Sequence, residues 1–319
     1  MTQATSTHKD FLSVLNFDAT DFDRCLQLAA QLKSDRALGR HAPTADALNG
    51  RPIALLFDKP SLRTRTTFQI AICELGGRVV SLQADVALGR REPVADVARN
   101  LERWVDAVVI RTFSQAVLEQ FAASTKRLHV INALTDAEHP CQAIADFLTL
   151  RERFGALKGR TIAYVGDGNN VATSLAHASM MLGVNLHVAS PEGYQLPHGV
   201  VQQATSHARH GARLRLFTEA ADAVVGADAV YTDTWTSMGQ EAEAETRRAA
   251  FASYQVNEEL MSLAKPGALF MHCLPAHRGE EVTADVFDSD ASVVFDQAEN
   301  RLHGQKALLL MLLAPMASI

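Results

Sequence analysis

Short runs of apolar and β-branched residues alternate with amphipathic stretches along almost the whole chain. The runs with the length of a strand lie at residues 53–57, 79–82, 107–111, 129–132, 161–165, 186–189, 229–232, 268–272 and 293–295. Between them, apolar residues recur at helical spacing, for example over 22–32, 117–123 and 172–182. Strands that alternate with helices indicate βαβ units, and continuous apolar strands are typical of a parallel sheet that is buried on both faces.

The pattern has a boundary near residue 150. Residues 140–154 predict one helix, which is followed by a polar turn and a new strand at 161. We therefore expect an α/β fold of two Rossmann-like domains with parallel sheets, covering residues 1–150 and 151–298. We expect residues 299–319 to form a C-terminal helix that crosses back to the first domain. Ligands of such sheets bind at the carboxyl ends of the strands, so we expect a cleft between the two halves.

Composition narrows the possible partners. The 319 residues are 47% hydrophobic and 21% charged, which is ordinary for a globular protein. A net charge of −6 disfavours binding to nucleic acid or to an anionic membrane, so any bound anion needs a local cluster of cations. The four cysteines form no CxxC pair, and neither a signal peptide nor an apolar run of about 20 residues is present. These features predict a cytoplasmic protein.

A candidate anion site follows the first predicted strand. Ser61 stands where a helix N-cap belongs, and apolar residues then recur at helical spacing until Gly76 and Gly77. A helix N-terminus offers free N–H groups and a positive dipole end, and Arg63 adds a bidentate partner, so this segment suits a phosphate. The alternative is an ordinary capped helix with solvated arginines.

Several motifs along the chain occur together in one family. They are PSLRTRTTF at 60–68, Arg111 at a strand end, HPCQ at 139–142, GDGNN at 166–170, DTWTSMG at 233–239, HCLP at 272–275 and ENR at 299–301. In this order they resemble the motifs of the aspartate and ornithine carbamoyltransferases, and the resemblance covers nearly the whole chain.

The resemblance implies that residues 1–150 bind carbamoyl phosphate. It assigns this substrate to Ser61, Leu62, Arg63, Thr64, Arg111, His139, Gln142, Cys273, Leu274 and Arg301. Within this set, the phosphate would be held by Ser61, Arg63, Thr64 and the backbone around Leu62. Arg111 and His139 would contact the carbamoyl oxygen.

The second half is implied to bind the acceptor. The DTWTSMG segment resembles the ornithine-binding loop, and the resemblance assigns ornithine to Asn170, Asp233, Ser237 and Met238. The implied reaction transfers a carbamoyl group to the δ-amine of L-ornithine and forms L-citrulline and phosphate, without cofactor or metal. Its implied catalytic residues are Arg111, His139, Asp233 and Cys273.

Four alternatives remain at this point. Leu62 stands where the family usually has threonine, a feature of transcarbamylases that use N-acetyl- or N-succinylornithine. The GDGNN segment also resembles the start of a dinucleotide fingerprint, although Val171 occupies the third glycine position. Zinc bound by His272, Cys273 and His277 is disfavoured because adjacent residues of a strand point to opposite faces. A non-catalytic homologue is disfavoured because the set of implied active-site residues is intact.

The family resemblance also implies a homotrimer or an assembly of trimers. In family members a loop of the neighbouring subunit closes over carbamoyl phosphate, and here that loop resembles residues 85–90. Ala87 replaces the usual glutamine or histidine in this loop, so we expect a weakened contact or one made by Arg90 or Arg91.

Overall fold

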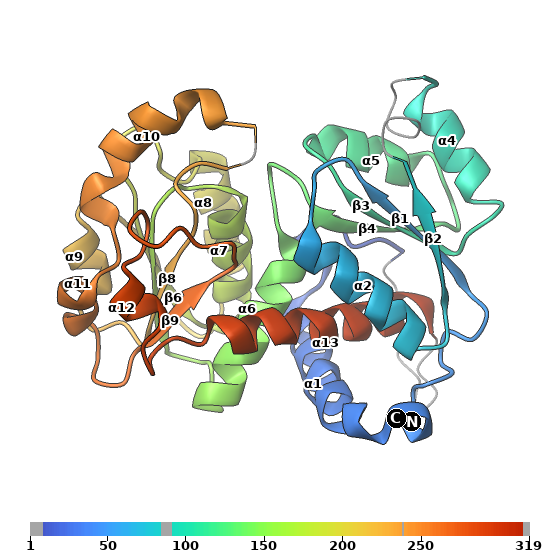
Figure 1. The fold of residues 1–319 in the computed structure, drawn as a ribbon, viewed down its shortest axis with the longest axis horizontal. Helices are drawn as coiled ribbons and strands as arrows, with labels where there is room; N and C mark the ends of the chain where they lie inside the picture. Colours follow the sequence, from blue (N-terminus) through green and yellow to red (C-terminus); the bar gives the residue numbers. More distant parts are fainter. Residues whose placement is uncertain (1–8, 84–90, 238, 315–319) are drawn as a thin grey trace. The chain divides into compact units, whose positions relative to one another are not determined.

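The computed structural model describes residues 9–83, 91–237 and 239–314, and it contains two parallel β-sheets (Figure 1). The expected α/β class with two parallel sheets is confirmed. The chain forms two compact units, one of Met1–Leu148 with Glu299–Ile319 and the other of Thr149–Ala298. Helices α6 (Pro140–Phe154) and α13 (Val294–Leu313) each continue from one unit into the other.

The first unit is built on a four-stranded sheet of order β2-β1-β3-β4. Its strands are β1 (Pro52–Phe57), β2 (Arg78–Leu82), β3 (Ala107–Arg111) and β4 (His129–Leu134). Its helices are η1 (Val14–Asn16), α1 (Ala19–Asp35), η2 (Arg36–His41), α2 (Leu62–Glu74), α4 (Val94–Leu101) and α5 (Gln115–Ala123). Every residue of β3 is buried, as expected for a central parallel strand.

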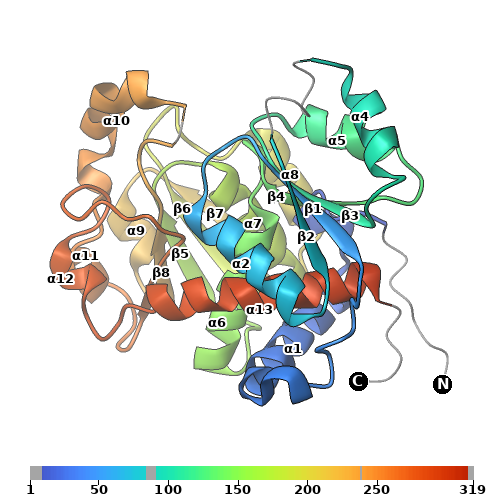
Figure 2. The same cartoon turned by 45° about the vertical axis from the view of Figure 1, so that its right-hand side comes forward.

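One face of this sheet is covered by α4 and α5, which lie side by side in both Figure 1 and Figure 2. Alternate residues of the strands, such as Ala54, Leu56 and Ile110, pack in one apolar cluster with Leu101 of α4 and Phe121 of α5. Burial of this cluster supplies the main stabilising term for that layer, because apolar area removed from water contributes about 25 cal/mol per Å².

The second unit has a five-stranded sheet of order β7-β6-β5-β8-β9. Its strands are β5 (Thr161–Val165), β6 (Asn185–Ala189), β7 (Leu214–Phe217), β8 (Ala229–Thr232) and β9 (Leu269–His272). Its helices are α7 (Asn170–Leu182), α8 (His198–Ser206), α9 (Ala220–Val224), η3 (Glu241–Glu243), α10 (Ala244–Phe251), η4 (Ala252–Tyr254), α11 (Glu258–Ser262) and α12 (Ala284–Phe287). A cluster around Ala163, Val230 and Phe270 packs against α9 and Phe251.

The prediction of a strand at residues 293–295 is wrong. Ser292 forms an isolated bridge with Phe270, and the chain then enters α13 at Val294. The β-branched pair Val293 and Val294 resembles a strand, but the residues after it are good helix formers and Asp296 lies in the first helical turn. The other eight predicted strands are present, and β7 was not predicted.

The carboxyl ends of the strands carry most of the residues with candidate chemistry. In the first unit β1 leads to Ser61, β3 ends at Arg111 and β4 is followed by His139. In the second unit β8 is followed by Asp233 and β9 by Cys273. Among the described residues, no helix has the length and apolar character needed to cross a membrane.

Candidate active site

The first cluster of candidate residues surrounds the N-terminus of α2. Ser61 is the N-cap of this helix, and its Oγ accepts a hydrogen bond of 3.2 Å from the Thr64 N–H. Leu62 begins the helix with its side chain 77% exposed, and Arg63 is half-buried. The helix therefore presents its positive dipole end beside an arginine, a combination that suits an oxyanion.

Arg301 of α13 reaches this helix end within the same unit. Its guanidinium donates hydrogen bonds to Gln142 Oε1 at 2.7 Å and to Thr64 Oγ1. Gln142 in turn donates from Nε2 to Asp146 Oδ1 at 2.7 Å, which fixes the orientation of its amide. All four side chains are buried, so the cluster holds a guanidinium in a rigid, desolvated position. Asp146 was not predicted from the sequence as a site residue.

Arg111 and His139 belong to the same cluster. Both are buried, at 7% and 4% exposure, and the charges of Arg301 and Arg111 act on the His139 ring. Burial first, and then the two guanidinium groups, hold the pKa of His139 well below its usual value. The ring is consequently neutral near pH 7 and donates through one N–H only.

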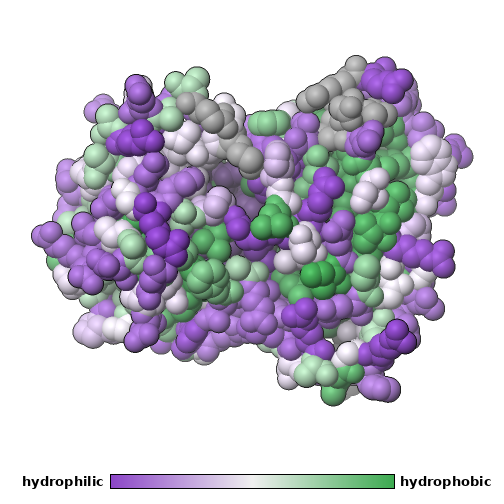
Figure 3. Space-filling model, in the orientation of Figure 1, coloured by the Kyte–Doolittle hydropathy of each residue, from purple (hydrophilic) through white to green (hydrophobic). Residues whose placement is uncertain are grey.

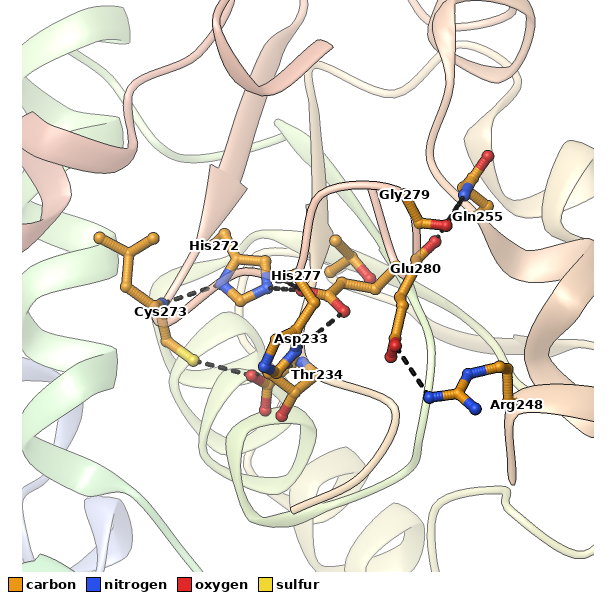
Figure 4. Close-up of polar contacts among 12 residues, drawn as sticks. Asp233, Thr234, Arg248, Gln255, His272, Cys273, His277, Gly279 and Glu280 are labelled. Atoms are coloured by element: carbon orange, nitrogen blue, oxygen red, sulfur yellow. Dashed lines mark hydrogen bonds and ion pairs between the residues drawn. The ribbon is translucent and has the colours of Figure 1, made fainter. Parts of the chain in front are cut away.

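The second cluster lies in the other unit and centres on Asp233 (Figure 4). Cys273 Sγ donates to Asp233 Oδ1 at 3.0 Å, and Asn169 Nδ2 donates to Oδ2 at 2.8 Å. The Thr234 N–H also donates to Oδ1 at 2.8 Å. Donors on both oxygens hold the carboxylate in one orientation, with lone pairs still able to accept from an amine.

Residues after β9 are held by a buried pair of side chains. His272 Nδ1 accepts from the Leu274 N–H at 2.9 Å, so the neutral ring carries its hydrogen on Nε2, which donates to Glu281 Oε1 at 3.2 Å. Burial raises the pKa of Glu281, but hydrogen bonds from His272 and the His277 N–H outweigh it and lower the pKa overall. The pair thereby positions both Cys273 and Leu274 (Figure 4).

His272 and Cys273 bring their ligand atoms close together, contrary to the expectation from strand alternation, whereas His277 lies with Glu280 and Glu281. The ligand atoms of Asp233, His272 and Cys273 lie within 4.8 Å of one another, because His272 is the last residue of β9 and Cys273 already lies beyond the strand. Both ring nitrogens of His272 nevertheless form hydrogen bonds, so a metal would have to displace Leu274 or Glu281.

A buried ion pair also lies near Asp233. Asp167 forms an ion pair of 2.5 Å with the buried Arg247, whose guanidinium also lies 4.9 Å above the ring of Tyr194. Burial is the largest influence on the Asp167 carboxyl, and with repulsion from Asp233 it outweighs Arg247, raising the pKa to about 6.

Two adjacent asparagines, Asn169 and Asn170, lie where the loop after β5 meets α7. Asn169 is the N-cap of α7, and its Oδ1 accepts from the Val171 and Ala172 N–H groups while its Nδ2 contacts Asp233. The predicted ornithine ligand Asn170 is the first residue of the helix and is half-buried. Asn169 is thus a site residue that was not predicted from the sequence, although the GDGNN motif contains it.

Of the two remaining predicted ornithine ligands, the structure describes Ser237 only. The half-buried Ser237 donates from its N–H to Gln240 Oε1 at 3.1 Å. Met238, and the loop at 85–90 with Ala87, lie outside the described residues.

Together the two clusters offer complementary chemistry. The first supplies guanidinium groups, a neutral imidazole, hydroxyls and a helix N-terminus, which suit a phosphate and a developing oxyanion. The second supplies an oriented carboxylate and a thiol, which suit an amine.

Family models match almost the entire chain. Residues 9–152 match the carbamoyl-P binding domain of aspartate/ornithine carbamoyltransferase, and residues 158–312 match its Asp/Orn binding domain.

Named relatives and solved structures are similar over nearly their full lengths. Ornithine carbamoyltransferase of Symbiobacterium thermophilum is 49% identical over 96% of this chain and 98% of its own, and that of Parasynechococcus marenigrum is 50% identical over 94% and 92%. The structure of ornithine carbamoyltransferase from Pyrococcus furiosus is 46% identical, with a TM-score of 0.90 over 95% of this chain and 96% of its own.

Proposed function

Since this chain belongs to the aspartate/ornithine carbamoyltransferase family, we propose that it is an ornithine carbamoyltransferase. It transfers the carbamoyl group of carbamoyl phosphate to the δ-amine of L-ornithine, and it releases L-citrulline and phosphate. The observation that carries this proposal is the buried Arg301, hydrogen-bonded to Thr64 and Gln142 at the N-terminus of α2. A buried guanidinium aimed at a helix N-terminus is costly for stability and useful for binding an anion.

In this proposal the first unit binds carbamoyl phosphate. Ser61, Arg63 and the N–H groups at Leu62 hold the phosphate, and Arg301 neutralises it from the opposite side. Gln142, oriented by Asp146, contacts the carbamoyl amide. The backbone N–H at position 62 is independent of the side chain, so leucine can replace threonine there with the loss of only one hydroxyl.

The second unit binds ornithine through Asp233, with Asn170, Ser237 and Met238 proposed for the α-amino and carboxylate end. The δ-amine must be neutral to attack, and an alkylamine has a pKa of about 10.4 in water. Desolvation lowers this pKa, whereas the Asp233 carboxylate opposes the change. Asp233 therefore orients the amine, and exclusion of water supplies the neutral form.

The transfer proceeds through a tetrahedral intermediate. The amine lone pair forms the new C–N bond, and the carbonyl electrons move onto oxygen, where Arg111, His139 and Thr64 donate hydrogen bonds. The C–O bond to phosphate then breaks, phosphate leaves with the electron pair, and it accepts the amine proton. Cys273 and the Leu274 carbonyl face the reacting amine and the carbamoyl amide. No covalent enzyme intermediate takes part.

The choice of acceptor is tested by comparing substrates. The relatives named above are ornithine carbamoyltransferases, which favours free ornithine over its N-acylated forms. We expect citrulline from carbamoyl phosphate and ornithine, and a far lower rate with N-acetyl- or N-succinylornithine. A faster rate with either acylated acceptor would reassign the substrate, and no turnover with any acceptor would favour the non-catalytic alternative.

The anion site is tested by substitution. Arg301→Gln is expected to lower kcat/KM by about 10²-fold or more, because it removes a charge from the transition state. Arg63→Ala, at a half-buried position, tests the same site with less risk to folding. Arg99→Gln, an exposed arginine of α4, is the control and should retain activity. Near-normal turnover by folded Arg301→Gln and Arg63→Ala would contradict the assignment.

We also propose that the protein is a cytoplasmic homotrimer, as the family resemblance implies. Edge strand β2 is only partly buried, and Trp104 of the same unit is 65% exposed. In Figure 3 hydrophilic residues cover much of the visible face, with apolar patches between them. Exposed apolar surface of this kind is typical of subunit contacts. Sedimentation velocity should give the mass of three chains or of a multiple of three, and a monomer at micromolar concentration would contradict the proposal.

A further inference from the structure

A polar pocket lies in the second unit, at the amino ends of the strands. It has a volume of about 370 Å³ and is lined by Thr161, Asn185, His187, Gly211, Arg213 and Arg215. The ornithine residues follow the carboxyl ends of β5, β8 and β9, so this amino-end pocket is a separate site in the same unit. A volume of this size is enough for a small metabolite.

The sheet register explains why these side chains converge. Thr161 pairs with Asn185 across β5 and β6, and His187 pairs with Arg215 across β6 and β7. Paired residues of a parallel sheet project from the same face, and so do residues two apart. Helix α9 packs on this face but has only five residues, and its Ala223 carbonyl bonds His187 Nδ1 at 3.0 Å. The face is therefore left open towards the amino ends.

The lining of the amino-end pocket is cationic. Arg213 and Arg215 are exposed, and neither has a carboxylate within 4.0 Å among the residues that the structure describes. The nearby acid Asp228 already binds Arg160 at 2.9 Å and Lys265 at 2.8 Å. Two guanidinium groups without local neutralisation favour an oxyanion, for which arginine provides a fork of N–H donors.

His187 adds a hydrogen-bonding group beside the two arginines. A carbonyl only accepts hydrogen bonds, so His187 Nδ1 carries a hydrogen, and Nε2 is the ring nitrogen that a ligand can contact. A hydroxyl group can either donate to or accept from Nε2, so a ligand that fits the pocket combines an oxyanion with a hydroxyl. We propose that the amino-end pocket binds a small phosphorylated metabolite that also carries hydroxyl groups, a function independent of carbamoyl transfer.

The simplest competing explanation concerns the edge of the sheet. β7 is an edge strand, and charged side chains on such a strand prevent pairing with other chains. That role requires charge alone, whereas the proposed site requires a specific response to a phosphorylated ligand.

Arginine labelling distinguishes the two explanations. The full-length protein is treated with phenylglyoxal, with ribose 5-phosphate or with ribose at about 10 mM, a concentration that would saturate a sub-millimolar site. Modification of Arg213 and Arg215 is then measured by mass spectrometry of their peptides. We expect ribose 5-phosphate to protect both arginines and ribose to protect neither, while exposed Arg248 is labelled equally in all samples. Protection should persist in Arg63→Ala, which separates this pocket from the phosphate site of the first unit.

Binding is then measured by calorimetry in the Arg63→Ala background. Adding Arg213→Gln and Arg215→Gln together should weaken binding of ribose 5-phosphate by about tenfold or more, because charge-assisted hydrogen bonds are lost. The same two substitutions in the otherwise native chain should leave citrulline formation unchanged. Equal labelling with ribose and ribose 5-phosphate, or unchanged affinity in the variant, would overturn the proposal. Neither measurement depends on turnover.

Discussion

Asp167 is a buried acid whose protonation responds to mild changes in pH. Its pKa is raised to about 6 by burial above all, and Arg247 opposes this increase only in part. A carboxyl whose pKa is higher in the folded state than the ordinary 3.8 binds its proton more tightly when the protein is folded. Its contribution to folding is therefore favourable at low pH and is lost as the pH rises from about 4 to about 6. The full change is about 3 kcal/mol.

The variant Asp167→Asn tests whether Asp167 stabilises the folded chain more at low pH than at neutral pH. At pH 4.5 the native chain keeps the stabilisation that comes from its tightly bound proton on Asp167, and the variant lacks it, so we expect the variant to be less stable at this pH. As the pH rises to 6.5, the buried Asp167 ionises in the native chain and destabilises it, whereas the asparagine of the variant does not titrate. The difference in unfolding free energy between the native chain and the variant should therefore narrow. Urea unfolding at several pH values measures the gap, and a gap that widens with pH would contradict the raised pKa.

Substitution of Asp233 tests whether this residue binds ornithine. The Cys273 and Asn169 donors require an acceptor at this position, and Asp233→Asn replaces one oxygen by an amide that donates. We expect KM for ornithine to rise about tenfold or more, while KM for carbamoyl phosphate changes little. Steady-state kinetics with each substrate varied in turn gives both constants. Asp222→Asn, an exposed acid of α9, is the matched control, and identical ornithine kinetics in both variants would exclude the role of Asp233.

Individual residues differed in how well the sequence predicted their surroundings. Ser61 was recognised as an N-cap because capping depends on local chemistry. Two contacts were not predicted, that of Asp146 with Gln142 and that of Asn169 with Asp233. Asn169 and Asp233 are 64 residues apart, and such a pairing is set by the sheet rather than by local pattern.

At the scale of elements, the loop between β5 and α7 depends on a close backbone approach. A Cβ atom at Gly168 would lie 2.3 Å from the Leu196 backbone nitrogen and 2.4 Å from the Gln195 carbonyl carbon. The glycine that suggested a dinucleotide fingerprint is thus required by the chain's own packing.

Gly168→Ala should therefore displace this loop together with Asn169. Backbone cannot yield as a side chain does, so we expect a loss of unfolding free energy of about 2 kcal/mol or more. KM for ornithine should rise in the protein that still folds. Gly199→Ala, in α8 with nothing within 4 Å of the added carbon, is the control and should be neutral or slightly stabilising. Thermal unfolding and kinetics of both variants provide the comparison, and equal stability would show that the loop accommodates a side chain.

Elements were predicted well where burial on both faces produced a continuous apolar run, as in β3 and β5. β7 was missed because it is a short edge strand, in which Arg215 interrupts the apolar residues. The error at 293–295 has the opposite cause, because local β-propensity was outweighed by the helix that follows.

At the scale of the whole molecule, the two units carry ionisable groups with opposite responses to acid. In the first unit burial above all lowers the pKa of His303 to about 4, and the pKa of His139 is also lowered. A histidine with a lowered pKa is protonated more readily in the unfolded chain, so the first unit loses stability as the pH falls below 6.5. In the second unit Asp167 has the reverse effect, since its raised pKa adds stability as the pH falls through 6.

Lowering the pH from 7 to 5 should consequently destabilise the first unit relative to the second, by about 1–2 kcal/mol for each of His303 and Asp167. Amide hydrogen exchange, corrected for the intrinsic effect of pH, measures protection in β1 and β3 of one unit and in β5 and β8 of the other. Protection in the first pair should fall faster. His303→Gln should reduce the pH dependence in the first unit alone, and Asp167→Asn should change it in the second unit alone. A parallel loss of protection in both units, unaffected by either substitution, would mean that these buried groups do not govern the acid response.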